Sequence, residues 1–266
     1  MEKHFSTTNS SKDSQLEIDS EKMSFLLHLA DSALILAQRN AEWCGHGPIL
    51  EQDIAITNIS LDLIGQARNF YQYAATLIGN TDEDKLAYLR TEREFKNLLL
   101  VEQPNGDWGQ TILRQFFFST YQFLLYNELQ KSTDQQIAAI VTKSLKEVTY
   151  HLRWSSEWVI RLGDGTEESR QRMLNAIDKL WMYTGELFIP ALYETEAALN
   201  GTGCNISNLK PQWEENIRTI FIEATLPYPG NVFNQTGGKD GRHSEHLGYI
   251  LAEMQYMQRT YPGSKW

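Results

Sequence analysis

Two acidic residues, Glu42 and Asp62, stand within otherwise apolar helical sequence between residues 41 and 68. This stretch, AEWCGHGPILEQDIAITNISLDLIGQAR, ends one apolar helix, breaks at Gly45-His46-Gly47-Pro48 and resumes as a second helix. An acid inside an apolar helix needs a partner, because an unpaired buried charge is costly. Carboxylates that project from neighbouring helices are the ligands with which a four-helix bundle builds a two-iron site. The chain can support that chemistry only if it also supplies the remaining ligands.

The first two helices supply only part of such a ligand set. A two-iron bundle takes one acid from each of two helices and Glu-x-x-His from each of the other two. Glu42 can be the first acid. The second helix carries Asn58, Asp62, Gln66 and Asn69 at three- and four-residue steps, so these side chains share one face. It has no Glu-x-x-His, and the second helix is therefore short of a histidine and an acid.

The later helices are also incomplete. The helix after residue 108 is apolar on nearly every side, which predicts a central buried helix, and it contains no Asp or Glu from 109 to 127. The next helix carries Glu147 and His151, one residue wider than the required spacing, and Val148 stands where the ligand acid is expected. We therefore predict a hydrogen-bonded polar network in the bundle interior rather than an iron site; such a network must be fully paired. The cations expected near this network are Arg39, Arg68 or Arg153.

A glycine-rich loop, GGKDGRH, is the second candidate site. It carries three groups that can be positive, Lys239, Arg242 and His243, and it opens onto a helix at Ser244. Loop and helix-terminal N–H groups favour anions, so this arrangement could hold a phosphate of coenzyme A. The same residues fit a solvated turn or a contact with a partner protein, which we favour.

Hydrophobic periodicity predicts an all-α protein. Apolar residues recur at three- and four-residue steps, and strand patterns are nearly absent. A shorter helix is predicted over 81–100, and shorter helices after residue 200 are expected to wrap the bundle. The polar residues 1–20 predict a disordered tail, and 21–266 a single helical domain. The four long helices are predicted near 21–44, 49–78, 108–131 and 133–162.

Composition restricts the partners. A net charge of −10 argues against nucleic acid or an anionic membrane. No apolar run approaches the roughly 20 residues that span a bilayer. Cys44 and Cys204 are the only cysteines, too few for a disulfide framework, and we expect reduced thiols in a cytoplasmic protein.

The chain from about residue 21 to 266 resembles a known family. The resemblance rests on the block around Glu42 and Asp62 together with EREFKNLLLVEQPNGDW, SLKEVTYHLRWSSEWVIRLGDGTEES and GRHSEHLGYILAEMQYMQRTYPG. These long, ungapped blocks are similar to the C subunits of bacterial phenylacetyl-CoA 1,2-epoxidase (phenylacetate-CoA oxygenase) complexes.

The resemblance implies a ferritin-like four-helix bundle with additional C-terminal helices, and a role in aerobic phenylacetate catabolism. In such complexes the paralogous A subunit holds two irons and inserts oxygen into the ring of phenylacetyl-CoA, with a B subunit and a reductase also present. The A subunit's ligand motifs fall on Leu63 to Gln66 and on Val148 to His151, so most ligands are lost here. Vestigial site residues are then Glu42, Asp62, Gln66, Glu147 and His151.

The resemblance implies a structural subunit that pairs with and stabilises the A subunit, with no catalytic residue, metal or cofactor of its own and iron only in that partner. Two alternatives remain: a di-iron oxygenase with an unusual ligand set, and an accessory module that binds coenzyme A through Lys239, Arg242 and His243. Whether the isolated chain forms a homo-oligomer is left open.

Overall fold

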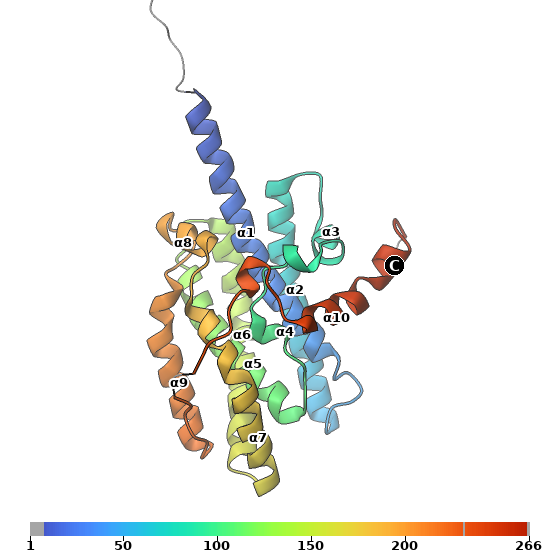
Figure 1. Cartoon of the computed structure of the whole chain (residues 1–266), viewed down its shortest axis with the longest axis vertical. Helices are drawn as coiled ribbons and strands as arrows, with labels where there is room; N and C mark the ends of the chain where they lie inside the picture. Colours follow the sequence, from blue (N-terminus) through green and yellow to red (C-terminus); the bar gives the residue numbers. More distant parts are fainter. Residues whose placement is uncertain (1–7, 231, 265–266) are drawn as a thin grey trace, which may run out of the picture.

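A computed structural model describes residues 8–230 and 232–264, and contains no strand among them. The helices α1 and α2 form one antiparallel pair, α5 and α6 form another, and α2 contacts α6 between the pairs (Figure 1). The predicted all-α, ferritin-like bundle with additional C-terminal helices is confirmed. The four long helices are α1 (Thr8–Ala41), α2 (Leu50–Ile78), α5 (Trp108–Leu129) and α6 (Gln135–Gly163).

Helix α1 begins earlier than the sequence indicated. Residues 8–20, predicted as part of a disordered tail, continue the helix, and residues 1–7 lie outside the described residues. No Gly or Pro occurs between Thr8 and Ala41, so nothing in the sequence terminates the helix before its first apolar turn. The division into a tail and a domain over 21–266 stays a prediction.

The crossover between the two helix pairs is not the single helix predicted over 81–100. Asp82 caps α3 by accepting a hydrogen bond from the Lys85 N–H at 2.8 Å, but the helix ends after one and a half turns. Beyond it, Phe95 and Leu98 are fully buried on extended backbone, which lets consecutive apolar residues enter the core from opposite sides. The elements of the crossover are α3 (Glu83–Tyr88), η1 (Glu92–Glu94) and α4 (Leu99–Glu102).

Helix α5 is the buried centre of the molecule, as its apolar sequence predicted. Asp107 caps it by accepting the Gln110 N–H at 3.0 Å. Its side chains are buried on nearly every side, and the Trp213 indole donates to the Phe117 carbonyl at 3.0 Å. The rest of the fold is therefore built around α5, which carries no acid before Glu128.

The C-terminal helices cover both pairs of the bundle (Figure 1). Helices α7 and α9 pack on α5 and α6, α8 packs on α1, and α10 contacts α1 and α4. The chain after residue 200 thus crosses the bundle, as predicted. These helices are α7 (Glu167–Leu180), α8 (Leu192–Leu199), α9 (Lys210–Glu223), α10 (Glu245–Met254) and α11 (Tyr256–Thr260).

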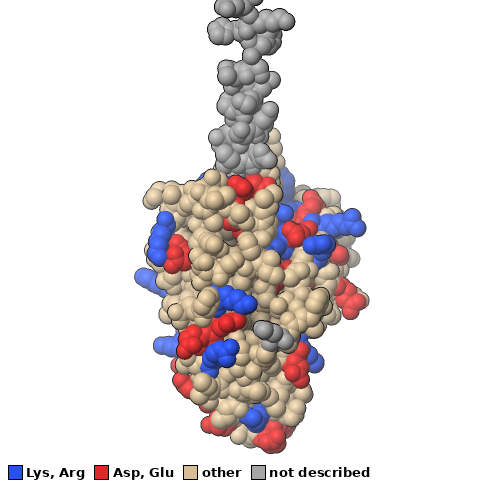
Figure 2. All heavy atoms as spheres, turned by 60° about the vertical axis from the view of Figure 1, so that its left-hand side comes forward, with Lys and Arg blue, Asp and Glu red and all other residues tan. Residues whose placement is uncertain are grey.

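Charged side chains of both signs lie on the face of the molecule drawn in Figure 2. Figure 2 shows Lys and Arg side chains interspersed with Asp and Glu on one face of the molecule, with no continuous basic area. The face drawn in Figure 2 thus lacks the basic stripe with which proteins hold nucleic acid backbones, and the chain has a net charge of −10. In the described part of the chain, no helix is both long enough and apolar enough to cross a membrane.

Candidate functional site

Four of the five residues predicted at a vestigial site lie together between α2 and α6. The His151 Nε2 atom is 3.0 Å from Asp62 Oδ2, and the Gln66 Nε2 donates to Glu147 Oε2 at 2.9 Å. The members of each pair come from the two helices, and the pairs lie one helical turn apart. His151 is fully buried, whereas the Asp62 side chain is 36% exposed, so the network runs from the bundle interior to its surface.

Helix α5 completes this network with one amide and one hydroxyl rather than with acids. The Gln122 Nε2 donates to Gln66 Oε1 at 3.0 Å, and the Tyr126 hydroxyl lies 3.4 Å from the same oxygen. Gln122 stands in the helix that the sequence showed to lack carboxylates, and its role was not predicted. Burial raises the pKa of the Tyr126 hydroxyl, which stays a neutral donor at physiological pH.

Glu42 does not join the other four residues. It lies just after the end of α1, where its carboxylate accepts from Arg39 Nη1 at 2.8 Å and from Asn105 Nδ2 at 2.8 Å. Its side chain is 41% exposed. The expectation that Glu42 projects into the bundle beside Asp62 is therefore wrong, because α1 ends before it can direct this residue inward.

The three arginines expected beside the network bond elsewhere. Arg39 contacts Glu42 and the Glu102 carbonyl, Arg68 contacts Glu83, and Arg153 contacts Glu157 on its own helix. The partners of Asp62 and Glu147 are instead His151 and Gln66, as described above.

These donors do not fit a pair of iron ions. Iron sites of this class need several carboxylates to offset the metal charge and bridge the ions, and this network has only Asp62 and Glu147. The Gln66 amide directs an N–H at Glu147, where a ligand would present a lone pair. Among the described residues no group of three or more His, Cys, Asp or Glu is placed to hold a metal. The arrangement is that of a hydrogen-bonded polar core.

We expect Gln66→Ala to lower the free energy of unfolding by roughly 1–3 kcal/mol, the cost of leaving buried hydrogen-bond groups unpaired. Gln66 is 1% exposed, and its removal leaves the Gln122 amide and the Glu147 carboxylate without the hydrogen bonds they make to it. Urea unfolding followed by circular dichroism measures the change. Glu42→Gln is the control: its exposed contacts predict a loss below about 1 kcal/mol. Equal losses in the two variants would contradict this assignment.

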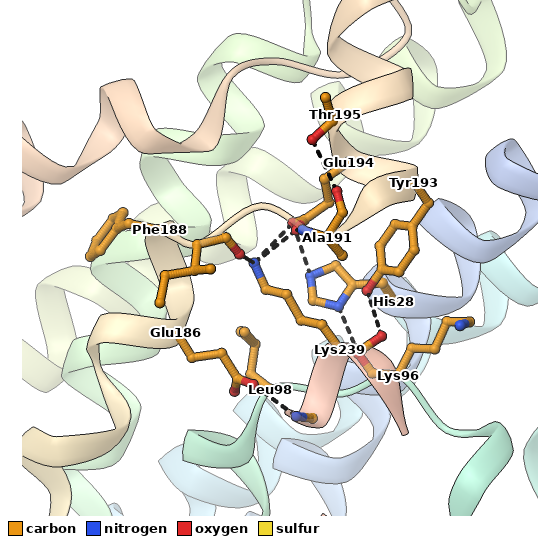
Figure 3. Close-up of polar contacts among 12 residues, drawn as sticks. His28, Lys96, Leu98, Glu186, Phe188, Ala191, Tyr193, Glu194, Thr195 and Lys239 are labelled. Atoms are coloured by element: carbon orange, nitrogen blue, oxygen red, sulfur yellow. Dashed lines mark hydrogen bonds and ion pairs between the residues drawn. The ribbon is translucent and has the colours of Figure 1, made fainter. Parts of the chain in front are cut away.

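The glycine-rich loop is closed by buried ion pairs (Figure 3). Lys239, only 4% exposed, places its Nζ 2.9 Å from Glu194 Oε2 and 3.0 Å from the Ile189 carbonyl. On the other side of Glu194, His28 Nε2 lies 3.5 Å from Oε1, and its Nδ1 lies 2.7 Å from the Lys96 carbonyl. The loop lysine thus points inward to a carboxylate of the same chain.

The loop does hold an anion, and that anion is Glu186. Its Oε1 accepts the N–H groups of Gly237 and Gly238 at 2.7 and 2.8 Å, and its Oε2 accepts the Leu99 N–H at 2.7 Å. Gly238 permits this approach, since a Cβ there would collide with the Asn97 carbonyl oxygen. Burial raises the pKa of Glu186, and the three N–H donors oppose that rise.

His243 and Arg242 face different surroundings. His243 Nδ1 lies 2.8 Å from Glu102 Oε2, with its Nε2 2.9 Å from the Phe95 carbonyl. Arg242 is exposed and contacts Asp240 at 3.2 Å. Of the three groups proposed to reach a phosphate, only Arg242 is accessible. The alternative of a coenzyme A contact at Lys239 and His243 does not fit the structure, because both side chains are directed into the protein. For the same reason these two residues do not belong to the solvated turn or partner contact that we favoured from the sequence.

Stability should depend on pH through His243. Burial alone would lower its pKa, but the hydrogen bond and charge of Glu102 raise it above the ordinary value. A histidine with a raised folded pKa stabilises the fold fully below about pH 6.5, and this contribution is lost as the pH rises through the folded pKa. The stability difference between the native chain and His243→Gln should therefore shrink from about pH 6 to pH 9. Urea unfolding across that range measures it, and a difference independent of pH would contradict the ion pair.

The burial of four acids was not predicted from the sequence. These acids are Asp31, Glu102, Glu186 and Glu194, each at most 2% exposed. A usable signal was present, since Asp31 and Glu102 are single acids within the apolar runs LLHLADSALILA and NLLLVEQ. An acid that interrupts an apolar run must have a partner when it is buried. Three of the four bond to residues 237–244, and so fasten the C-terminal segment to the bundle.

This chain is similar to known proteins over most of its length. The family model described as "Phenylacetic acid catabolic protein" matches residues 2–266. The chain is 50% identical over 242 residues to the C subunit of the 1,2-phenylacetyl-CoA epoxidase of Escherichia coli (strain K12), a match that covers 91% of this chain and 98% of that protein. Similarity over this extent, with the helical bundle described above, shows that the chain belongs to the phenylacetic acid catabolic protein family.

Proposed function

We propose that this chain is a structural, catalytically silent subunit of a phenylacetyl-CoA ring 1,2-epoxidase, and that it pairs with and stabilises an iron-bearing A subunit. The observation that carries the proposal is the amide-for-carboxylate network of Gln66, Gln122 and Glu147 in the bundle interior. A metal centre would need lone pairs where Gln66 and Gln122 present N–H groups. The similarity to the C subunit of an epoxidase supports the metabolic role.

Partner binding is a direct physical route to such a role. A protein that binds only the folded state of its partner stabilises it by mass action, by an amount that grows with the logarithm of its concentration relative to the Kd. A preformed helical bundle suits this role because it loses little conformational freedom on association. A silent subunit keeps the fold of a di-iron protein while its interior is occupied by hydrogen bonds.

The test is the metal content of the chain after expression alone in iron-replete medium and purification without chelators. We expect iron well below stoichiometric, and unchanged in His151→Gln. The competing possibility, a di-iron oxygenase with an unusual ligand set, requires about two irons per chain, as in other carboxylate-bridged bundles, and their loss in His151→Gln. That result would overturn the proposal.

A second measurement tests the stabilising role in the assembled complex. Turnover of phenylacetyl-CoA by the reconstituted epoxidase should depend on the presence of this chain, and should survive Glu147→Gln in it. The A subunit expressed without this chain should be less soluble or less active. Equal solubility and turnover of the A subunit without this chain would contradict the proposal.

A further inference from the structure

A cavity of about 410 Å³ opens to solvent beside α9. Its walls come from three parts of the sequence, residues 181–188, the first half of α9 and residues 228–234. Its volume is within the range of about 300–1,000 Å³ that small-molecule sites occupy. The described residues that line it include none from the polar network between α2 and α6 and none from the glycine-rich loop. The cavity is therefore a separate candidate site.

The floor of the cavity is made of packed aromatic rings. The ring centroids of Trp181 and Trp213 are 5.8 Å apart, and Phe188 meets Trp213 at 5.4 Å. Tyr228 continues the row, with its ring edge-on to Trp181 at 5.2 Å. These four rings, called the aromatic floor below, offer the faces and edges against which a planar aromatic ligand packs.

The aromatic floor is held in place by the chain itself. The Trp181 indole donates to the Gly230 carbonyl at 3.3 Å, and the Trp213 indole donates to the Phe117 carbonyl at 3.0 Å. Both indole N–H groups are thus used, so a ligand would meet the carbon surfaces of the two rings. A floor whose rings are already fixed loses little side-chain freedom when a ligand binds.

The rim of the cavity carries more positive than negative charge. Lys210, Glu214 and Arg218 follow one another at four-residue steps on one face of α9. Glu214 lies 3.9 Å from the Lys210 amine. Arg218 instead stacks on Tyr228, with its guanidinium carbon 3.4 Å from the ring centroid, and forms no ion pair among the described residues. Two cations and one acid at the rim favour an anionic ligand over a cationic one.

Arg218 joins the charged rim to the aromatic floor. Its guanidinium lies over Tyr228, and Tyr228 contacts Trp181. An exposed guanidinium without an acid partner can bind a carboxylate through two parallel N–H donors. The Asn234 amide lies at the same rim, directly against Gly185, where a Cβ would come within 2.2 Å of the Asn234 Cγ atom.

We propose that this cavity binds a small aromatic carboxylate, with the ring on the aromatic floor and the carboxylate on Arg218. Rings and a free guanidinium at one site are the two features that such a ligand requires. The description of the family, a phenylacetic acid catabolic protein, supplies the first probe, phenylacetate. The proposal does not depend on the catalytic silence proposed above, because the iron content that tests silence does not bear on this cavity.

The test is calorimetric titration of the full chain with phenylacetate, benzoate and 3-phenylpropionate, with tryptophan fluorescence as a second readout. At least one of the three should bind saturably at one site and change the fluorescence, because two tryptophans form the floor. Phenylacetamide lacks the charge and acetate lacks the ring. Each should bind at least about tenfold more weakly than the matching aromatic acid.

Variants at the rim test where the carboxylate lies. Arg218→Gln should weaken binding by about tenfold or more, since it removes a charge-assisted contact. The matched control is Arg161→Gln: Arg161 is also exposed and also lies over an aromatic ring, Trp158, at 5.4 Å, but outside the cavity. It should bind like the native chain. Circular dichroism verifies that each variant is folded.

Two nearly isosteric variants read the sign of the ligand's charge. Asn234→Asp adds a negative charge at the rim and should weaken binding, whereas Glu214→Gln removes one and should strengthen it, each by about threefold to tenfold. Neither change alters the side-chain volume much, so the shape of the cavity is kept.

The proposal is overturned if none of the three aromatic acids binds saturably, or if Arg218→Gln binds them as tightly as Arg161→Gln does. Equal binding of phenylacetamide or of acetate would show that the site does not require both parts of the ligand, and would also overturn it. Tighter binding in Asn234→Asp would contradict an anionic ligand.

Discussion

Asp31→Ala is expected to lower the free energy of unfolding by about 3–5 kcal/mol, the cost of breaking a buried ion pair from one side. Asp31 is fully buried in α1, where its carboxylate accepts from the Arg90 guanidinium, from the Tyr71 hydroxyl at 2.5 Å and from the Lys96 N–H at 2.8 Å. Burial alone would lower the pKa of Arg90, and the charge of Asp31 raises it. The guanidinium stays charged after the substitution because an arginine is not deprotonated in proteins. The variant therefore leaves a buried cation without its anion.

Urea unfolding of Asp31→Ala measures this loss, and two further variants identify its origin. Glu157→Ala removes an exposed contact, 4.0 Å from Arg153, and should cost little. Asp31→Ala combined with Arg90→Ala should cost less than the sum of the two single losses, because residues in one network couple. Additive losses would mean that Asp31 and Arg90 contribute separately, and would contradict the ion pair as the source of the effect.

The bundle itself was predictable from local pattern. Apolar residues at three- and four-residue steps located the four long helices, and the break at Gly45 to Pro48 marked where the first of them ends. The centrality of α5 followed from apolar residues on every side of it. The failure over 81–100 has a physical cause. Phe95 and Leu98 are buried from extended backbone, and a short apolar run carries no signal that separates this from a helix.

The hydrogen-bond partners of the polar residues could be predicted less well from the sequence than the helices. The face of α2 with Asp62 and Gln66 was located correctly, but its partners are His151 and Glu147, and not the predicted arginines. Pairing between helices some eighty residues apart depends on packing, which local periodicity does not encode. Glu42 shows the same limit, since a residue just past a helix end takes its direction from the turn and not from the helix.

The buried acids explain how the C-terminal segment is held. Glu102, Glu186 and Glu194 come from the crossover and from the segment around α8, and all three receive donors from residues 237–244. Each carboxylate is satisfied by several hydrogen bonds, which is the condition under which burial of a charge is tolerated. The glycine-rich loop has the sequence of a phosphate-binding loop, but residues 237–244 bind three carboxylates of the same chain.

Lys239→Met is accordingly expected to destabilise the chain by about 3–5 kcal/mol, because it leaves Glu194 buried without its cation. Methionine keeps most of the side-chain volume, so the loss reports the missing charge. The exposed Arg242→Gln is the matched control and should leave stability unchanged. Calorimetric titration with coenzyme A should give the same result for native and variant chains. A Lys239→Met chain that is as stable as the native chain but binds coenzyme A more weakly would contradict the structural role of the Lys239–Glu194 ion pair. It would indicate that this loop binds a ligand.

The cost of Lys239→Met should also depend on pH, in a direction set by His28. Burial lowers the pKa of His28, Glu194 raises it, and Lys239 lowers it further. Removing Lys239 therefore raises the pKa of His28, whose imidazolium can then neutralise Glu194 from 3.5 Å. A raised folded pKa adds stability below it, so the loss should be smaller near about pH 5 than near pH 8. Urea unfolding at both values measures this, and a loss that grows as the pH falls would show that His28 does not replace the lysine.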